Sequence, residues 1–312
     1  MLTTPKQLAI GRIRAVLRRQ LRRNRVRTRL PSPVLQVFRA IRGGLSRPAR
    51  APQIFPDENQ SAENGSSVVS LSQFDGKFEL PAGNRLARHL LEGNFERHIA
   101  ALLRAAISPG DEFIDVGANL GIYTVLAGSL VGPTGRVLAV EPTPSMLELL
   151  KSNIVHNSLT NVTVFPGVIS NRVGQCTLEF VAGGEQYSSI DAIAHPDVPM
   201  GRREKITVSS ETLDSLVSRF SLCPAAIKVD TEGAEALVFS QATETLRQHR
   251  PILISELDQR LLAAHGGSAR AVAEGWFAQD YEVFNAETGD LYVPGRFPDD
   301  FIGEVVALPR LQ

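Results

Sequence analysis

The chain has 312 residues, of which 43% are hydrophobic, and its 33 basic and 33 acidic side chains give a formal net charge of zero. This composition is typical of globular proteins, and it excludes disorder over the whole length, a collagen-like repeat and a disulfide-stapled miniprotein. The length suits one large domain with an appendage, or two small domains.

The charge is unevenly distributed along the chain. Residues 1–50 contain 14 basic residues and no Asp or Glu, so the other residues hold 19 basic and 33 acidic side chains. A segment charge of +14 is therefore balanced by −14 elsewhere. This asymmetry predicts an anion-seeking arm on an acidic body, with residues 1–67 as arm and linker and residues 68–312 as the folded domain.

The arm has the pattern of a basic interfacial helix. Ile10, Ile13, Leu17 and Leu21 recur at spacings of three and four among arginines. Such a stripe could bind an anionic membrane surface. A free or partner-docking tail is the alternative. Nucleic acid is disfavoured, because no aromatic residue is interleaved among these arginines to stack on bases.

After the linker, the sequence predicts a hairpin and then alternating strands and helices. A Gly-containing turn at 75–76 joins the first two strands, and a helical stretch over 85–106 is broken near Gly93. The predicted strands cover 68–71, 77–80, 113–116, 136–140, 162–165, 176–181, 225–229, 251–255, 281–284, 291–293 and 304–308. Further helices are predicted near 122–130, from Pro144 to about 154, over 234–249 and over 268–279.

This alternation predicts an α/β fold with a doubly wound, mostly parallel sheet and helices on both faces. The hairpin at 281–293 is expected to add antiparallel strands at one edge. The segment 183–205 is expected to be a long loop, of the kind that often forms a lid. His195 in this loop is the best functional candidate among the six histidines, none of which has metal-ligand spacing.

Cysteine content and hydropathy bear on the compartment. Cys176 and Cys223 are too few for a disulfide framework, and they predict buried thiols in a reducing environment. No run approaches 18 consecutive apolar residues, and arginines from Arg12 onward interrupt any signal-like segment. We expect a cytoplasmic protein that the arm could hold at a membrane surface. Oligomeric state leaves no signal in the sequence.

A glycine loop follows the predicted strand at 113–116. In α/β sheets such loops let the backbone approach a ligand, and an acid that ends the next strand can accept hydrogen bonds from ribose hydroxyls. Glu141 occupies that second position. The candidate cofactor-binding residues are therefore Asp115, Gly117, Asn119, Gly121 and Glu141.

The loop favours S-adenosylmethionine over a dinucleotide. A dinucleotide fingerprint needs a glycine at position 119, where this chain has Asn119. Asp115 would also repel a pyrophosphate, whereas a carboxylate there suits a cationic cofactor. Two alternatives remain. One is a binding or scaffold protein that keeps the cofactor-binding fold without catalysing a reaction, and the other, weaker one is a nicotinamide-dependent oxidoreductase.

Three blocks of sequence resemble the FkbM family of S-adenosylmethionine-dependent methyltransferases. They are Asp115-Val116-Gly117-Ala118-Asn119-Leu120-Gly121-Ile122-Tyr123-Thr124, Glu141-Pro142 and Ile227-Lys228-Val229-Asp230-Thr231-Glu232-Gly233-Ala234-Glu235. The resemblance covers about residues 75–308 and implies a class I methyltransferase (Rossmann-like) fold, with Tyr123 among the cofactor contacts. It also implies O-methylation of a hydroxyl on a sugar, glycolipid or secondary metabolite. Phe95 stands where the family usually has Tyr before the acid, which leaves the role of Glu96 open.

Methyl transfer to a hydroxyl needs alignment and a group that takes the proton. Asp230 ends a predicted strand and is the first candidate, Glu256 ends the next strand, and Glu232 opens the following helix. Glu232 and Glu235 could instead serve only the helix dipole. No metal is required by the sequence, although Asp230, Glu256 and Asp258 could share a divalent ion.

Overall fold

The computed structural model describes residues 53–54, 66–81, 85–93, 95–181, 188–190 and 202–310. Predictions about the arm at 1–50 and about His195 fall outside the described residues. So does most of the linker and of the segment 183–205.

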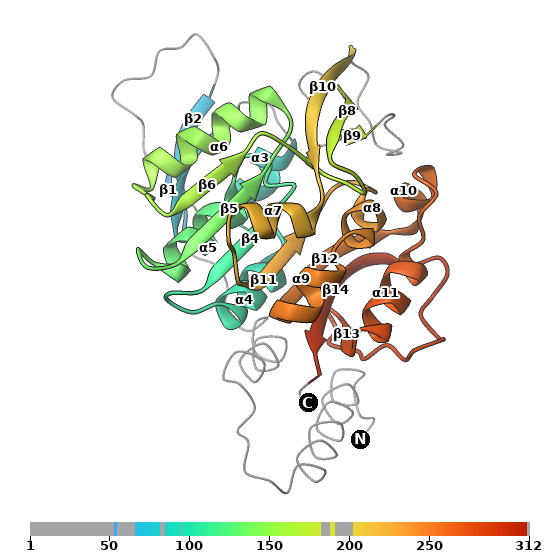
Figure 1. Cartoon of the computed structure of the whole chain (residues 1–312). Helices are drawn as coiled ribbons and strands as arrows, with labels where there is room; N and C mark the ends of the chain where they lie inside the picture. The colour runs from blue at the N-terminus through green and yellow to red at the C-terminus, as the bar shows by residue number, and fades with distance from the viewer. Residues whose placement is uncertain are drawn as a thin grey trace, which may run out of the picture.

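Seven strands form the central sheet, in the order β13-β14-β12-β11-β4-β5-β6 (Figure 1). Their bounds are β4 (Glu112–Val116), β5 (Arg136–Val140), β6 (Val162–Phe165), β11 (Pro224–Val229), β12 (Ile252–Asp258), β13 (Tyr281–Asn285) and β14 (Ile302–Pro309). Strands β6 to β12 are parallel, and β14 runs antiparallel to both of its neighbours. The chain starts at β4, moves outward to β6 and returns to β11, so the strand order reverses between β4 and β11.

Helices cover both faces of this sheet, as the alternation of strands and helices predicts (Figure 1). On one face lie α4 (Arg97–Ala106), α5 (Ile122–Val131) and α6 (Pro144–His156). On the other lie α7 (Leu213–Arg219), α8 (Glu235–Ser240), α9 (Thr243–His249), α10 (Gln259–Ala264) and α11 (Ala269–Ala278). Successive strand residues point to opposite faces, so Phe113 packs in the α4–α5 core and Ile114 in the α7–α11 core.

An N-terminal cap packs on the α5–α6 side. It consists of β1 (Gln53–Ile54), β2 (Ser66–Leu71), β3 (Gly76–Pro81) and α3 (Arg85–Leu91). The predicted hairpin turn is present, with Asp75 at φ 52°. The buried side chain of Asn153 on α6 accepts a hydrogen bond from the Glu79 amide at 2.6 Å and donates one to the Leu120 carbonyl at 2.8 Å. The cap is thereby joined to the loop that follows β4.

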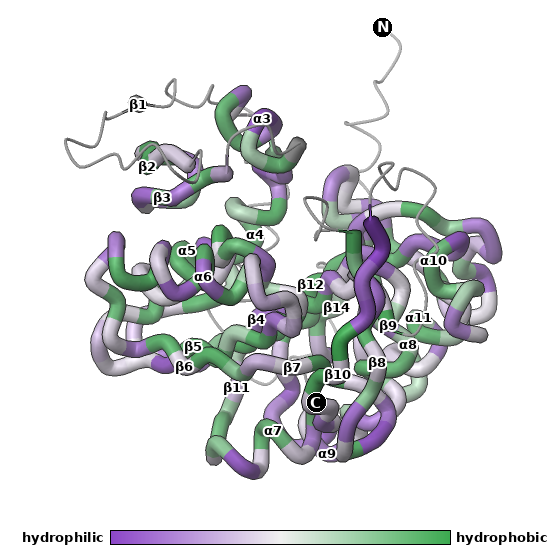
Figure 2. Tube along the Cα trace, turned by 90° about the horizontal axis from the view of Figure 1, so that it is seen from above, coloured by the Kyte–Doolittle hydropathy of each residue, from purple (hydrophilic) through white to green (hydrophobic). Residues whose placement is uncertain are grey.

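A second, four-stranded sheet has the order β7-β10-β8-β9. Its strands are β7 (Gly167–Ile169), β8 (Gly174–Val181), β9 (Ser189–Ile190) and β10 (Arg203–Glu211). The first residues of β10 are hydrophilic, in contrast to the apolar strands of the central sheet (Figure 2). Because β9 and the start of β10 lie within 183–205, the prediction of a loop over this segment was wrong at those residues.

Two predicted elements differ in the structure. The helix predicted over 234–249 is two helices, because the carboxylate of Asp214 accepts hydrogen bonds from the amides of Glu244 and Thr245 and caps the start of α9. The strand predicted at 291–293 is wrong. Leu291 forms a single bridge with Phe284, and Pro294, which has no amide hydrogen, follows closely. Strand β13 pairs with β14 instead. The edge strand of the sheet is therefore β13, and the antiparallel strand β14 lies next to it, between β13 and β12.

The two cysteines differ in exposure. Cys176 is buried, as predicted, whereas Cys223 is exposed because it lies on the turn that precedes β11. Within the described ranges, every helix is too short or too polar to cross a membrane.

Candidate active site

A cleft of about 450 Å³ opens at the carboxyl ends of the parallel strands, where the strand order reverses. Its floor is the loop after β4 together with the ends of β5, β11 and β12. The connection between α3 and α4 forms one wall, and β7, β8 and β9 form the other. The cleft thus lies where the sequence predicts the ligand, and the four-stranded sheet borders it.

The loop after β4 is packed too closely for any side chain at its first glycine. Gly117 has φ +79°, and a Cβ there would lie 1.8 Å from the carbonyl oxygen of Asp230. Asn119 also adopts a left-handed conformation, at φ 52°. The requirement for glycine at position 117 therefore comes from contact with the end of β11 as well as from the turn itself.

The backbone amides of this loop are already used within the protein. The amides of Gly117 and Ala118 donate to the carbonyl of Val140, and the amide of Gly121 donates to the carbonyl of Ala118. The amide of Asn119 donates to the carboxylate of Glu141, and the amide of Leu120 donates to the side-chain oxygen of Asn119. A bound pyrophosphate needs such amides as donors. The loop therefore lacks the anion cradle that a dinucleotide requires at this position.

Glu141 is held rigidly at the end of β5. One carboxylate oxygen accepts hydrogen bonds from the amide and hydroxyl of Thr143, and the other accepts from the Asn119 amide at 2.8 Å. Burial raises the pKa of Glu141, and these hydrogen bonds oppose the rise. Since each carboxylate oxygen can accept two hydrogen bonds, Oε2 keeps capacity for a ligand hydroxyl.

Gly117, Asn119, Tyr123 and Glu141 line the cleft, but Asp115 and Gly121 do not. Asp115 is 1% exposed and accepts a hydrogen bond from the hydroxyl of Thr124 at 2.6 Å. A Cβ on Gly121 would lie 2.5 Å from Leu150. These two residues shape the loop from behind, and Asp115 adds negative charge beneath it.

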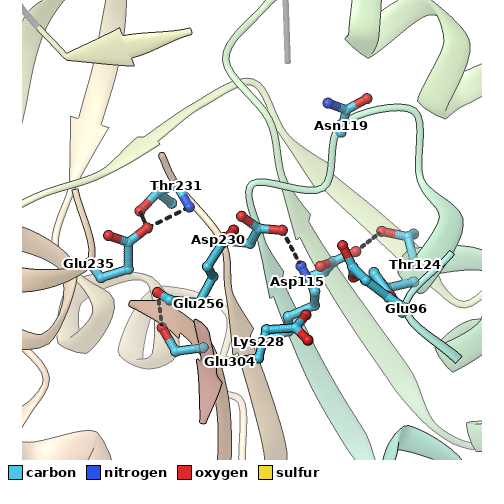
Figure 3. A network of polar contacts seen from close by, with 12 residues as sticks. Glu96, Asp115, Asn119, Thr124, Lys228, Asp230, Thr231, Glu235, Glu256 and Glu304 are labelled. Atoms are coloured by element: carbon cyan, nitrogen blue, oxygen red, sulfur yellow. Dashed lines mark hydrogen bonds and ion pairs between the residues drawn. The ribbon is translucent and has the colours of Figure 1, made fainter. Parts of the chain in front are cut away.

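A buried lysine organises the other end of the cleft. Lys228 on β11 is opposite Asp115 on β4, and its ammonium group donates to Asp230 at 2.8 Å (Figure 3). It also lies 4.7 Å from the centre of the Tyr123 ring. Burial lowers the pKa of Lys228, but Asp230, Glu96 and Asp115 more than offset this and raise it. Lys228 is therefore a permanent cation, and it pairs with an acid.

Several carboxyl groups crowd around this ion pair. Glu256 on β12 is directly opposite Glu304 on the antiparallel β14, and His98 contacts Glu304. Burial, Asp230 and Glu232 raise the pKa of Glu256 to about 9. Burial and Asp230 also raise the pKa of Glu232 well above its usual range. At neutral pH, Glu256 is therefore protonated, whereas Lys228 keeps Asp230 in an ion pair.

Glu96 is a cleft residue to which sequence reasoning gave no role. It precedes α4 in a left-handed conformation, at φ 39° and ψ 45°, and accepts a hydrogen bond from the Tyr123 hydroxyl at 2.5 Å. Burial raises the pKa of Glu96 to about 7, although Lys228 lowers it. The resemblance left the role of Glu96 open, and the sequence could not place its carboxylate near Lys228 (Figure 3).

Other candidate acids are used elsewhere. Glu235 accepts hydrogen bonds from the amide and hydroxyl of Thr231 at 2.8 Å and fixes the turn before α8. Asp258 pairs with Arg260 at 2.6 Å and caps α10. In the part of the chain that the structure describes, no group of three or more His, Cys, Asp or Glu side chains could hold a metal ion.

The sheet order, its single antiparallel strand, and the cleft between the glycine loop and Glu141 define a class I methyltransferase with a Rossmann-like fold. Residues 115–268 match the family model described as the methyltransferase FkbM domain. This match, over 154 of the 312 residues, confirms the resemblance to the FkbM methyltransferases that the sequence predicted.

Curated relatives share shorter segments. A probable cobalt-precorrin-6B C(15)-methyltransferase (decarboxylating) of Sulfolobus acidocaldarius is 32% identical over 110 residues, which are 34% of this chain and 57% of that protein. A protein-L-isoaspartate O-methyltransferase of Aeropyrum pernix is 38% identical over 66 residues, which are 21% of this chain and 23% of that protein. For the cobalt-precorrin enzymes, the chain spans about half the length of the relatives it matches.

A methyltransferase FkbM from Methylobacillus flagellatus KT is similar among solved structures. It is 16% identical to this chain and aligns with a TM-score of 0.41, covering 64% of this chain and 44% of that one.

Proposed function

We propose that the protein is an S-adenosylmethionine-dependent O-methyltransferase acting on a hydroxyl of a sugar, a glycolipid or a secondary metabolite. The observation that carries this proposal is the division of one cleft into two ends. Glu141 and the glycine loop form one end, and carboxyl groups around the pair formed by Lys228 and Asp230 form the other. The match to the FkbM family model supports methyl transfer as the reaction.

The residues at the loop end fit this cofactor. Glu141 keeps acceptor capacity for a ribose hydroxyl, and the occupied amides of residues 117–121 disfavour a phosphate-bearing alternative. The volume of about 450 Å³ lies within the range of small-molecule sites. When bound, the cofactor supplies an electrophilic methyl group on a positively charged sulfur.

The spacing of the strands sets where the two ends lie. Glu141 ends β5, and Asp230 follows β11, with β4 between these two strands. Adjacent strands are about 4.8 Å apart, so the ends of β5 and β11 lie about 10 Å apart at the cleft. A ligand held at Glu141 and lying across the loop after β4 would bring its other end to Asp230. The negative charge of Asp230 then favours the cationic sulfur.

The same residues favour a neutral hydroxyl as the acceptor. Glu256 is protonated at neutral pH and can donate a hydrogen bond to an acceptor oxygen, and the raised pKa of Glu232 favours the same role for its carboxyl group. Asp230 can accept a hydrogen bond. A phosphate or carboxylate acceptor would place its own negative charge beside the Asp230 carboxylate in a partly buried site. We therefore assign acceptor binding and alignment to Asp230, Glu232 and Glu256.

Binding of S-adenosylhomocysteine, measured by isothermal titration calorimetry, tests the cofactor assignment. Loss of charge-assisted hydrogen bonds in Glu141→Ala is expected to weaken binding about 10-fold to 100-fold. Glu148→Ala removes an exposed carboxylate on α6 and should bind like the wild type. Equal affinity in wild type and folded Glu141→Ala would contradict the assignment, as would tighter binding of NAD.

We also infer that the arm at residues 1–50 places the enzyme at an anionic membrane surface. Its 14 basic residues and no acidic ones support this, since each basic residue near such a surface contributes about 1 kcal/mol. The full-length protein should sediment with vesicles of phosphatidylglycerol and phosphatidylcholine but not with pure phosphatidylcholine. Sedimentation that persists after deletion of residues 1–50, or a preference for RNA over the vesicles, would overturn this inference.

A further inference from the structure

Glu96 reaches the cleft from outside the segment that matches the family model. It lies between α3 and α4 and lines the cleft, whereas the matched segment begins at residue 115. It occupies the N-cap position of α4, yet its side chain makes no capping hydrogen bond. A glutamate in a left-handed conformation is strained, and such strain persists where surrounding structure fixes it, often at functional sites.

Tyr123 holds the Glu96 carboxylate in place. The tyrosine hydroxyl donates to Oε2 of Glu96 at 2.5 Å. The tyrosine ring is itself fixed by Phe74 in an edge-to-face contact at 5.6 Å and by Lys228 at 4.7 Å. Among the described residues, the other oxygen of Glu96, Oε1, has no hydrogen-bond partner. Glu96 therefore presents an oriented carboxylate with one oxygen left for a ligand.

The other cleft acids are poorly suited to take a proton from an alcohol. Glu256 already carries a proton at neutral pH, because burial and neighbouring carboxylates raise its pKa to about 9. Burial and Asp230 also raise the pKa of Glu232. Asp230 already accepts a hydrogen bond from the permanent cation of Lys228 at 2.8 Å, so one of its carboxylate oxygens is engaged. Glu96, with a pKa of about 7, changes its protonation in the range that general-base catalysis requires.

We propose that Oε1 of Glu96 accepts the proton of the acceptor hydroxyl during methyl transfer, with Tyr123 as its positioning residue. This rests on the proposed function. The acceptor O–H bond breaks and its proton moves to Glu96, while the oxygen forms a bond to the methyl carbon. The carbon–sulfur bond breaks, and its electron pair stays on sulfur, which becomes neutral. Glu96 loses its negative charge as the cofactor loses its positive one.

Other titratable groups surround Glu96 and would contribute to any pH dependence. They lie on α4, α5, β14, β12 and the end of β11: His98, Tyr123, Glu304, Glu256, Lys228 and Asp230. The difference between the wild type and Glu96→Gln isolates the part that belongs to Glu96. Tyr123→Phe removes the hydrogen bond that lowers the pKa of Glu96, and it leaves the ring in place.

The test compares two ligands that differ at the reacting position, so it needs no acceptor. Sinefungin carries an ammonium group where the methyl group would lie, and S-adenosylhomocysteine carries a neutral sulfur. If Glu96 faces that position, the preference of the full-length protein for sinefungin should rise about tenfold or more from pH 6 to pH 8, as Glu96 ionises. Calorimetry at several pH values gives both affinities.

In Glu96→Gln the rise should disappear, while the affinity for S-adenosylhomocysteine stays within about twofold. In Tyr123→Phe the rise should move to higher pH, which a purely structural role of the hydroxyl would not cause. Glu92→Gln, an exposed carboxylate four residues earlier, should behave like the wild type. A pH-dependent preference that survives in Glu96→Gln overturns the assignment of Glu96. Failure of the wild type to bind S-adenosylhomocysteine at all overturns the proposed function instead.

Discussion

The two ends of the cleft differ in how their polar groups are paired. At the loop end, each polar group described above has a partner within the protein, and Glu141 alone holds three hydrogen bonds. At the other end, Glu96, Glu232 and Glu256 are crowded together around one cation, Lys228, and burial raises the pKa of each acid. Preformed hydrogen bonds suit the binding of a constant ligand, whereas crowded acids provide groups that can exchange protons near neutral pH.

Gly117→Ala should have the largest effect, because it changes the tightly packed glycine loop at the cofactor end of the cleft. The added Cβ would overlap the Asp230 carbonyl, and we expect a loss of about 4 kcal/mol or more in the free energy of unfolding, with loss of cofactor binding. Urea unfolding and calorimetry would measure both. Gly266→Ala is the matched control, since it also has positive φ but no atom within 4 Å, and should cost about 1–2 kcal/mol. Similar costs at the two positions would refute the packing explanation.

Lys228→Met should destabilise the crowded end by about 3 kcal/mol, because Asp230 and Asp115 would lose their buried cation. The loss should shrink at low pH, because burial raises the pKa of Asp115 and a protonated Asp115 carries no charge for the cation to balance. Urea unfolding at about pH 5 and pH 8 measures the difference. Lys228→Arg keeps the charge and should recover part of the stability. A pH-independent loss would show that packing of the aliphatic chain, and not charge, is responsible.

Glu256→Gln should alter how stability depends on pH. The folded protein keeps the Glu256 proton up to a pH of about 9, whereas the unfolded chain loses it near 4.5, so the folded state binds more protons between these values. Stability therefore falls as pH rises through this window, by at most about 1.4 kcal/mol per pH unit for this group. The variant should show a flatter profile and be more stable than the wild type at about pH 8. A profile parallel to that of the wild type would place the titration elsewhere.

Deletion of residues 1–50 should have the smallest effect on either end. The deleted residues lie outside the resemblance to the family and carry none of the cleft residues named here. We expect the affinity for S-adenosylhomocysteine to change by less than about twofold in calorimetry, within ordinary surface effects. A large loss of affinity would mean that the arm takes part in the cofactor site and that the charge asymmetry does not mark a division of roles.

Local sequence patterns predicted the loop end well. The glycine positions and the acid that ends β5 lie within a few residues of the strands that carry them, so spacing was enough to place them. Asp230 and Glu256 followed from the rule that parallel strands end at one edge. These predictions needed no knowledge of distant pairings.

Residues placed by tertiary contacts could not be predicted in the same way. Glu304 faces Glu256 only because β14 inserts antiparallel between β12 and β13 in a particular register. Glu96 reaches Tyr123 because the cap folds over α5. The four-stranded sheet was missed because its strands β8 and β10 pair across a long connection, and β10 has only a partial alternation of buried and exposed residues.

The single side chain of Asn153 makes the cap inseparable from the loop that follows β4. It accepts from the Glu79 amide and donates to the Leu120 carbonyl, so removing the cap would leave a buried amide oxygen unsatisfied beside the cofactor loop. The segment at 115–268 that matches the family model therefore depends on contacts with residues outside it. Exchanging it between relatives would preserve the site only if the exchanged pieces kept this bridge.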